Sequence, residues 1–177
     1  GGGTVNWTNP WGEYRFIDDI EIREDGGTPG FLQAIKAALC MELKEQMGVD
    51  NIRRREEEMT RLAFQAFSAV PDLHILAGDV HDRLAVFSFY ITGIHYNMVV
   101  RLLNDRFGIQ ARGGCACAGT YGHLLLDLDY TQSKRIADQV IHGDLSEKPG
   151  WVRISLHPTI TNEEIMFIAD ALLQIRN

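Results

Sequence analysis

The chain has 177 residues, of which 45% are hydrophobic and 23% charged, a balance typical of a folded globular protein. Its formal net charge of -7 argues against a nucleic-acid partner, because phosphate binding needs an excess of lysine and arginine on one face. No apolar run approaches the ~20 residues that a membrane-spanning helix needs, so the sequence predicts no membrane partner either.

Helical periodicity and turn residues predict most elements in chain order. Residues 1–13 show no periodicity and are predicted to be irregular. Thr28 before Pro29 is a plausible helix opening, Gly48 a terminator, and Asp50 the cap of the next helix. The predicted strands cover 14–22, 74–77, 84–91, 109–112 and 151–156. The predicted helices cover 31–47, 51–69, the segment from His95 or Asn97 to about Phe107, 131–142, and the segment from a cap at Thr161 or Asn162 to the end. This order predicts an α/β protein, more narrowly α+β, with a small sheet covered on one face.

Three cysteines are present: Cys40, Cys115 and Cys117. This low, odd number is not a disulfide framework and fits a reducing cytosol, so we predict a cytoplasmic protein. Cys40 falls on the apolar helix 31–47, where a small core residue is the simplest interpretation.

The stretch QARGGCACAGTYGH, residues 110–123, holds the densest chemistry in the chain. Cys115, Cys117 and His123 are metal-type ligands, but zinc sites use cysteines two to four residues apart and four ligands. A disulfide across a single residue would close a strained ring. The glycines also suit a purely structural turn. Finally, Arg112 would favour a nearby thiolate, so the stretch also suits a reactive thiol site. The residues alone leave these interpretations open.

Four stretches, in order, resemble the C-terminal part of the class V aminotransferase family, which includes the cysteine desulfurases and selenocysteine lyases. GGGTV (1–5) resembles the glycine-rich segment after the cofactor lysine, and REDGGTP (23–29) resembles the turn that opens a long helix. IQARGGCAC (109–117) resembles the cysteine loop, and VRISLHPTITNEEI (152–165) resembles the arginine-centred strand that leads into the final helix.

The resemblance implies roles for particular residues. Cys117 matches the sulfur-accepting nucleophile of the desulfurases, and Arg153 matches the arginine that holds the substrate carboxylate. Arg112 opens the cysteine loop and is implied to contact the substrate or the thiolate. Gly27 and Thr28 match the turn that reaches the phosphate of pyridoxal 5'-phosphate (PLP) in the neighbouring subunit. The resemblance implies no metal ligand.

The resemblance also implies how the whole protein is organised. We expect a fragment of a longer homodimeric PLP enzyme acting on an amino acid, with the cofactor lysine outside this chain. We expect 1–28 to be the end of the large cofactor domain, 29–70 the interdomain helices, and 71–177 a small domain with a mainly antiparallel sheet and helices on one face. Alone, the chain is expected to be inactive. The desulfurase, transaminase and lyase branches stay open, and the alternative is a metal- or thiol-binding module using Cys115, Cys117 and His123.

Overall fold

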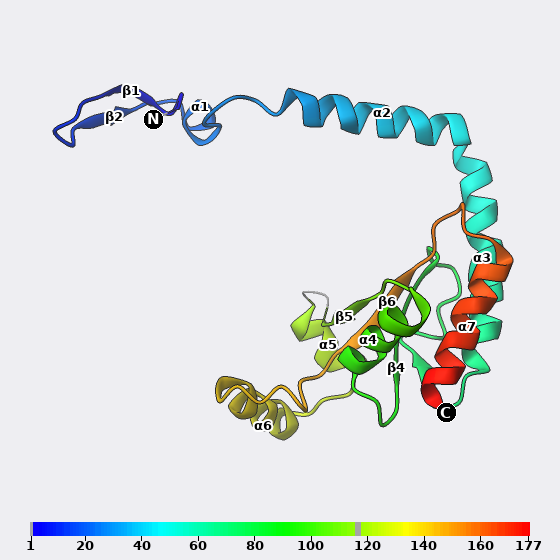
Figure 1. The fold of residues 1–177 in the computed structure, drawn as a ribbon. Coiled ribbons are helices and arrows are strands. Elements are labelled where there is room, and N and C mark those ends of the chain that lie inside the picture. Colours follow the sequence, from blue (N-terminus) through cyan, green and yellow to red (C-terminus); the bar gives the residue numbers. More distant parts are fainter. Residues whose placement is uncertain (1, 116–117) are drawn as a thin grey trace. The chain divides into compact units, whose positions relative to one another are not determined.

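The computed structural model describes residues 2–115 and 118–177, and the chain divides into two compact units, Gly1–Val49 (unit 1) and Asp50–Asn177 (unit 2). The elements are labelled in Figure 1. The helices are α1 (Ile20–Glu24), α2 (Phe31–Met47), α3 (Val49–Ser68), α4 (Tyr96–Phe107), α5 (Gly119–Leu125), α6 (Tyr130–Ile141) and α7 (Asn162–Arg176). The strands are β1 (Val5–Thr8), β2 (Tyr14–Phe16), β3 (Leu73–Ile75), β4 (Val86–Ile91), β5 (Arg112–Gly114) and β6 (Trp151–Ser155). Among the described residues, no helix is long and apolar enough to cross a membrane.

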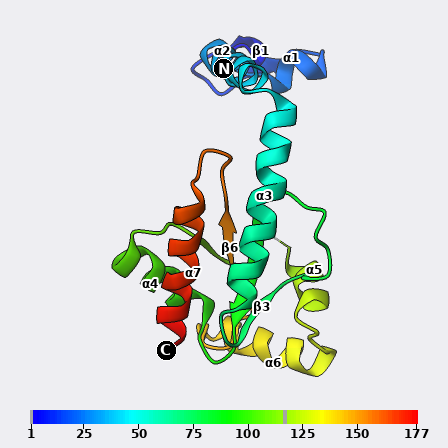
Figure 2. The same ribbon diagram turned by 90° about the vertical axis from the view of Figure 1, so that its right-hand side faces the viewer.

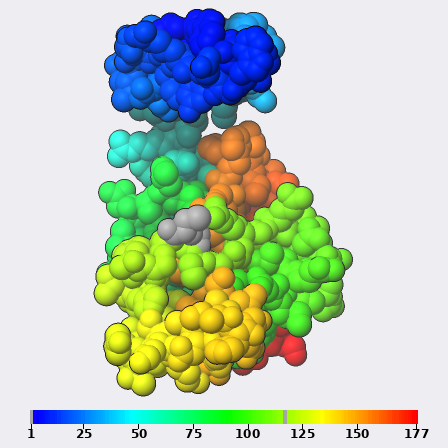
Figure 3. All heavy atoms as spheres, turned by 90° about the vertical axis from the view of Figure 1, so that its left-hand side faces the viewer, coloured from blue at the N-terminus to red at the C-terminus, as the bar shows by residue number. Residues whose placement is uncertain are grey.

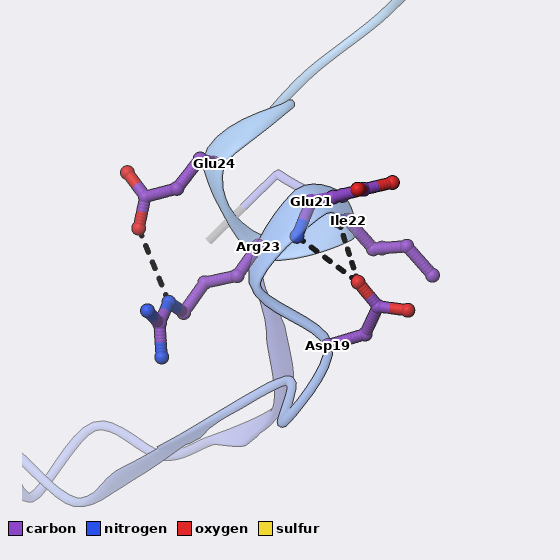
Figure 4. Close-up of polar contacts among 5 residues, drawn as sticks. All are labelled: Asp19, Glu21, Ile22, Arg23 and Glu24. Carbon is purple, nitrogen blue, oxygen red and sulfur yellow. Dashed lines mark hydrogen bonds and ion pairs between the residues drawn. The ribbon is translucent and has the colours of Figure 1, made fainter.

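Two of the structures predicted for unit 1 from the sequence are wrong. The supposedly irregular segment 1–13 contains β1, which pairs antiparallel with β2. The predicted strand 14–22 is wrong beyond Phe16, because 20–24 forms α1. Asp19 explains that helix: its carboxylate accepts hydrogen bonds from the backbone N–H groups of Glu21 at 3.0 Å and Ile22 at 3.3 Å, as Figure 4 shows. Such a cap satisfies N–H groups that a short helix otherwise leaves open.

The helix α2 follows its prediction. It begins after Gly30, without a side-chain cap, and ends at Gly48, whose φ of 82° suits glycine and whose N–H donates to the carbonyls of Lys44 and Glu45. Asp50 does not cap the next helix as expected. It lies within the first turn of α3, because that helix already begins at Val49.

Unit 2 is built on a four-stranded antiparallel sheet in the order β3-β4-β6-β5. Strand β4 alternates, so that Phe87, Phe89 and Ile91 are buried while the residues between them are half-buried. These side chains join α3, α4 and α7 in one core, in which Phe67 packs edge-on against Phe87. Figures 1 and 2 show α3 and α7 side by side over the sheet. The predicted α/β class with a small antiparallel sheet is confirmed. The helices α3, α4 and α7 pack on one face of that sheet, as expected, whereas α5 lies on the opposite side.

The opposite side of this sheet is called the outer face. Alternate residues of a strand point to opposite sides, and Val152 points into the core, so its neighbour Trp151 points to the outer face. Trp151 is nevertheless buried. Gly122 of α5 lies against the Trp151 ring: a Cβ at this glycine would be 3.2 Å from it. No helix was expected at α5, because Gly119 and Gly122 disfavour a helix in this short segment.

The helix α6 confirms the expectation for 131–142 to within a residue at each end. Asp129 and Gln132 form a capping box at its start. Figure 3 shows α5, α6 and the segment 143–150 gathered on one side of unit 2. Tyr130 and Ile141 are 81% and 78% exposed on this side.

A polar cluster joins α3 to the start of α7. Arg55 donates to the Asn162 side chain at 2.7 Å and to the carbonyl of Ile160 at 2.5 Å, and it pairs with Glu58 at 2.9 Å. Asn162 in turn donates to Glu58 at 3.0 Å. The hydrogen bond from Asn162, followed by that from Arg55, lowers the pKa of Glu58. The charged form of Glu58 therefore stabilises the contact between these two helices.

We expect Glu58→Gln to lower the midpoint of thermal unfolding at pH 7, and the difference from the native chain to shrink as the pH falls toward 4. A carboxylate with a lowered folded pKa stabilises above its unfolded pKa, and this stabilisation is lost as the pH falls through the folded pKa. Unfolding followed by circular dichroism at pH 7 and pH 4 measures the difference. Glu56→Gln on the same helix is the control, and a loss with Glu58→Gln that does not depend on pH would contradict this account.

Candidate active site

Two arginines lie directly opposite each other on the outer face. Strand β5 pairs with β6 so that Arg112 is the register partner of Arg153. Residues on either side of Arg153, Val152 and Ile154, point into the core, so both arginine side chains project from the outer face. Directly opposed residues have Cβ atoms about 4.5–5.5 Å apart, and like charges at this separation repel. A bound anion would relieve that repulsion. We call Arg112 and Arg153 the guanidinium pair.

The surroundings of Arg153 leave its donors available. Its side chain is half-buried and makes no hydrogen bond or ion pair with any residue in the described ranges. Ser88 of β4 is its register partner on the other side, so Ser88, Arg153 and Arg112 form one row across three strands. A guanidinium held on a strand presents a fixed fork of donors, which matches a carboxylate with two parallel hydrogen bonds.

Glycines shape the chain after Arg112. A Cβ at Gly113 would lie 3.0 Å from the Tyr96 ring and 3.1 Å from Val100, so only glycine lets β5 lie this close to α4. Gly114 has a φ of 113°, which is available to glycine and strained for other residues. The predicted strand 109–112 is therefore shifted in the structure to Arg112–Gly114. Pairing with β6 decides this register, and local sequence does not show it.

Cys115 follows directly and is held in place. Its thiol is half-buried and donates to the carbonyl of Pro149 at 2.9 Å. Burial, and to a smaller extent Cys115, raises the pKa of Tyr96, so this phenol stays protonated at neutral pH. Cys115 thus joins the glycine loop to the segment before β6. Cys117, the predicted nucleophile, lies outside the described residues.

His123 has a structural environment. One ring nitrogen, Nδ1, lies 2.7 Å from the carbonyl of Gly119, and the other, Nε2, lies 2.8 Å from the hydroxyl of Ser133. These contacts join α5 to α6. Across 2–115 and 118–177, no group of three or more histidine, cysteine or acidic side chains is placed to hold a metal ion. Cys115 and His123 both use their polar atoms within the protein, so nothing here favours the metal-binding alternative.

Gly27 and Thr28, the predicted phosphate-binding residues, lie in unit 1. Gly27 has a φ of 95°, and its N–H donates to the carbonyl of Gly2 at 2.6 Å. This amide is therefore used within the turn. Thr28 is exposed, and its hydroxyl has no hydrogen-bond partner in the part of the chain that the structure describes. The helix α2 begins just beyond, without a side-chain cap and without an acidic residue in its first turn. An uncapped helix start with a nearby hydroxyl suits the phosphate of a cofactor.

The structure therefore brings together Arg112 and Arg153 from the predicted set, with Cys115 three residues beyond Arg112. The sequence analysis did not single out Ser88. The sequence does contain a signal for this residue: Ser88 is a polar residue between Phe87 and Phe89 in a strand that is otherwise mostly apolar. That it lies beside Arg153 follows only from the pairing of β4 with β6.

Comparisons with known proteins agree on the protein family to which this chain is similar. Residues 1–168 match the family described as Aminotransferase class-V. A probable cysteine desulfurase of Halobacterium salinarum is 33% identical over 100 residues, which are 56% of this chain and 24% of that protein. One of Synechocystis sp. is 30% identical over 111 residues, 62% of this chain and 26% of that protein. The chain thus matches about a quarter of the length of these relatives.

Solved structures show the same fold. The apo cysteine desulfurase of Thermococcus onnurineus NA1 has a TM-score of 0.63 and 22% identity, over 98% of this chain and 38% of that one. A cysteine desulfurase of Escherichia coli has a TM-score of 0.62 and 18% identity, over 99% of this chain and 37% of that one. At 22% and 18% identity, this likeness shows a shared fold and nothing more.

Proposed function

Because the chain belongs to the class V aminotransferase family, we propose that it is the C-terminal part of a PLP-dependent enzyme that acts on an amino acid, of the cysteine desulfurase type. Two findings support this proposal: the curated relatives are probable cysteine desulfurases, and this chain corresponds to about a quarter of their length. The remaining residues of such an enzyme would supply the cofactor lysine. We propose that the enzyme is cytoplasmic, since the few cysteines fit a reducing compartment. We also propose that it is a homodimer, as the family resemblance implies.

The observation that carries the proposal is the guanidinium pair. Arg153 is half-buried, without a partner among the described residues, and opposite a second cation. In the proposed enzyme, Arg153 binds the substrate carboxylate through two parallel hydrogen bonds and fixes the orientation of Cα. Arg112 adds a second positive charge beside that carboxylate, or beside the thiolate of Cys117. When a carboxylate loses such a charged partner, the free energy of binding typically becomes less favourable by about 2–5 kcal/mol.

The cofactor would be PLP, which supplies an electron sink for the cleavage of a bond to Cα. Thr28 would hold its phosphate through the hydroxyl, with the N–H groups of the first turn of α2 beyond it. The turn at Gly27, whose positive φ suits glycine and which is fixed by its hydrogen bond to Gly2, holds Thr28 in front of that helix. We propose that this turn serves the cofactor of the neighbouring subunit, as the family resemblance implies.

Cys117 would accept the sulfur. Its thiolate forms a new bond to the sulfur of the substrate L-cysteine while the Cβ–S bond breaks. The electron pair of that bond stays on Cβ, which takes up the proton that the substrate thiol loses, so the products are L-alanine and a persulfide on Cys117. Sulfur is transferred as a neutral atom and needs no further oxidant. A nearby guanidinium such as Arg112 favours the thiolate form that this attack needs.

The full-length enzyme, given PLP and L-cysteine with a thiol reductant, is expected to release alanine and sulfide in equal amounts. The 177-residue chain alone is expected to fold and to release neither, and borohydride should trap no stoichiometric PLP–lysine linkage in it. Amino-acid analysis and a sulfide assay measure both. Amino transfer to a keto acid without sulfide release would place the enzyme in the transaminase branch and overturn the desulfurase proposal.

A further inference from the structure

Ser88 lies directly opposite Arg153 on the outer face, as its register partner from β4. Phe87 and Phe89 on either side of Ser88 point into the core, so its side chain points outward like that of Arg153. Directly opposed side chains have Cβ atoms about 4.5–5.5 Å apart. A hydroxyl one bond from its Cβ is therefore close enough for the longer arginine side chain to reach it.

Neither of these two polar groups has a partner in the part of the chain that the structure describes. The Ser88 side chain is half-buried, and its hydroxyl makes no hydrogen bond with a described residue. The same holds for the guanidinium of Arg153. A serine hydroxyl can accept a hydrogen bond, whereas a guanidinium only donates. Arg112, on the other side of Arg153, therefore cannot be an acceptor for it.

The other outward residues around this guanidinium are less suited to accept from it. Ser155 lies two residues along the same strand, about 6.6 Å away, and is exposed. Tyr90 is a diagonal neighbour on β4, but its ring stacks on that of His74 from β3, with the ring centroids 4.8 Å apart. Val86 has no polar side-chain atom, and the indole of Trp151 only donates. Ser88 is thus the side-chain acceptor best placed for Arg153.

A bound carboxylate leaves donors of the guanidinium unused. Two parallel hydrogen bonds to a carboxylate occupy one edge of the group, and three of its five N–H donors remain. A hydrogen bond from one of these to a neighbouring hydroxyl restricts the rotation of the guanidinium plane, and so keeps the other edge directed at the carboxylate. Such support from an adjacent side chain preorganises a binding group whose side chain is otherwise flexible.

We propose that Ser88 is a positioning residue for Arg153: its hydroxyl accepts a hydrogen bond from the guanidinium and so orients the donors that bind the substrate carboxylate. This inference rests on the proposed function, in which Arg153 binds that carboxylate. It adds to the site a residue that the family resemblance does not imply.

Binding of L-alanine to the full-length enzyme with PLP, followed through the visible absorbance of the cofactor, tests the role of Ser88. Ser88→Ala should raise the dissociation constant about five- to tenfold, because the guanidinium loses the hydrogen bond that orients it. Ser88→Thr keeps the hydroxyl and should stay within about twofold of the native enzyme. The matched control Ser155→Ala, on the same face, should also stay within about twofold. A native dissociation constant in Ser88→Ala would overturn the proposal.

Two further measurements show whether Ser88 acts through Arg153. Ethylamine has the amine and the two-carbon chain of L-alanine without the carboxylate, so Ser88→Ala should leave its binding unchanged. In an Arg153→Ala background, Ser88→Ala should no longer weaken the binding of L-alanine, because a double-mutant cycle isolates the interaction of the pair. An equal loss for ethylamine, or an equal loss in the Arg153→Ala background, would refute the positioning role.

Failure of this inference and failure of the proposed function give different results. A loss of L-alanine binding in Arg153→Ala without one in Ser88→Ala would overturn the role of Ser88 alone. Native binding in Arg153→Ala would overturn the carboxylate-binding role of Arg153 and, with it, the role of Ser88.

Discussion

Replacing Arg153 with alanine in the full-length enzyme is expected to lower kcat/KM for L-cysteine by about 30- to 5,000-fold, because a charged hydrogen-bonded partner of a carboxylate is worth about 2–5 kcal/mol. The half-buried guanidinium has no partner among the described residues, so its removal disrupts few interactions within the chain, which should still fold. Steady-state kinetics with PLP present measure the loss, and circular dichroism verifies the fold.

Two further variants sharpen this result. Arg153→Lys keeps the charge but loses the fork of donors, so its kcat/KM should fall between those of the native enzyme and Arg153→Ala. Arg101→Ala is the matched control: Arg101 pairs with Asp105 on the surface of α4 at 2.6 Å, and its loss should change kcat/KM by less than about twofold. If Arg153→Ala kept native kcat/KM, Arg153 would not bind the carboxylate.

The second large effect is expected at Cys117. Cys117→Ala in the full-length enzyme should abolish sulfide release from L-cysteine, because the sulfur then has no thiolate to receive it. Binding of the amino acid, followed through the visible absorbance of PLP, should be retained, since Arg153 is intact.

Cys115→Ala is the matched control for this experiment. Cys115 lies two residues before Cys117, is half-buried, and donates its thiol hydrogen to Pro149. Its loss should leave sulfide release in place. Should Cys115→Ala abolish the reaction and Cys117→Ala spare it, the roles of the two thiols would be exchanged. Activity that survives in both variants would mean that neither thiol accepts sulfur.

The helices were largely predictable because their signals are local. Thr161 and Glu164 form the capping box that begins α7, and Gly48 and Gly108 end α2 and α4 with positive φ angles. Each of these signals lies within a few residues of the helix end that it determines. Asp19 is the counterexample, because a strong cap there was overlooked in a segment that alternates weakly.

Strand pairing was not predictable in the same way. The strand β1 forms because β2 pairs with it, and β5 begins at Arg112 because β6 sets its register. The strands β5 and β6 are distant in sequence, whereas β1 and β2 are joined by a short loop, but all of these strands are short and carry little signal of their own. Family resemblance selected Arg112 and Arg153 one at a time. That they face each other, with Ser88 completing the row, depends on the sheet.

The central claim is that Arg153, opposite Arg112 on the outer face, binds the substrate carboxylate. A crystal structure of the full-length enzyme with PLP and L-alanine tests it most directly. We expect both carboxylate oxygens to accept hydrogen bonds from the Arg153 guanidinium. An amino acid whose carboxylate is bound by other residues, with Arg153 directed away from it, would contradict the account.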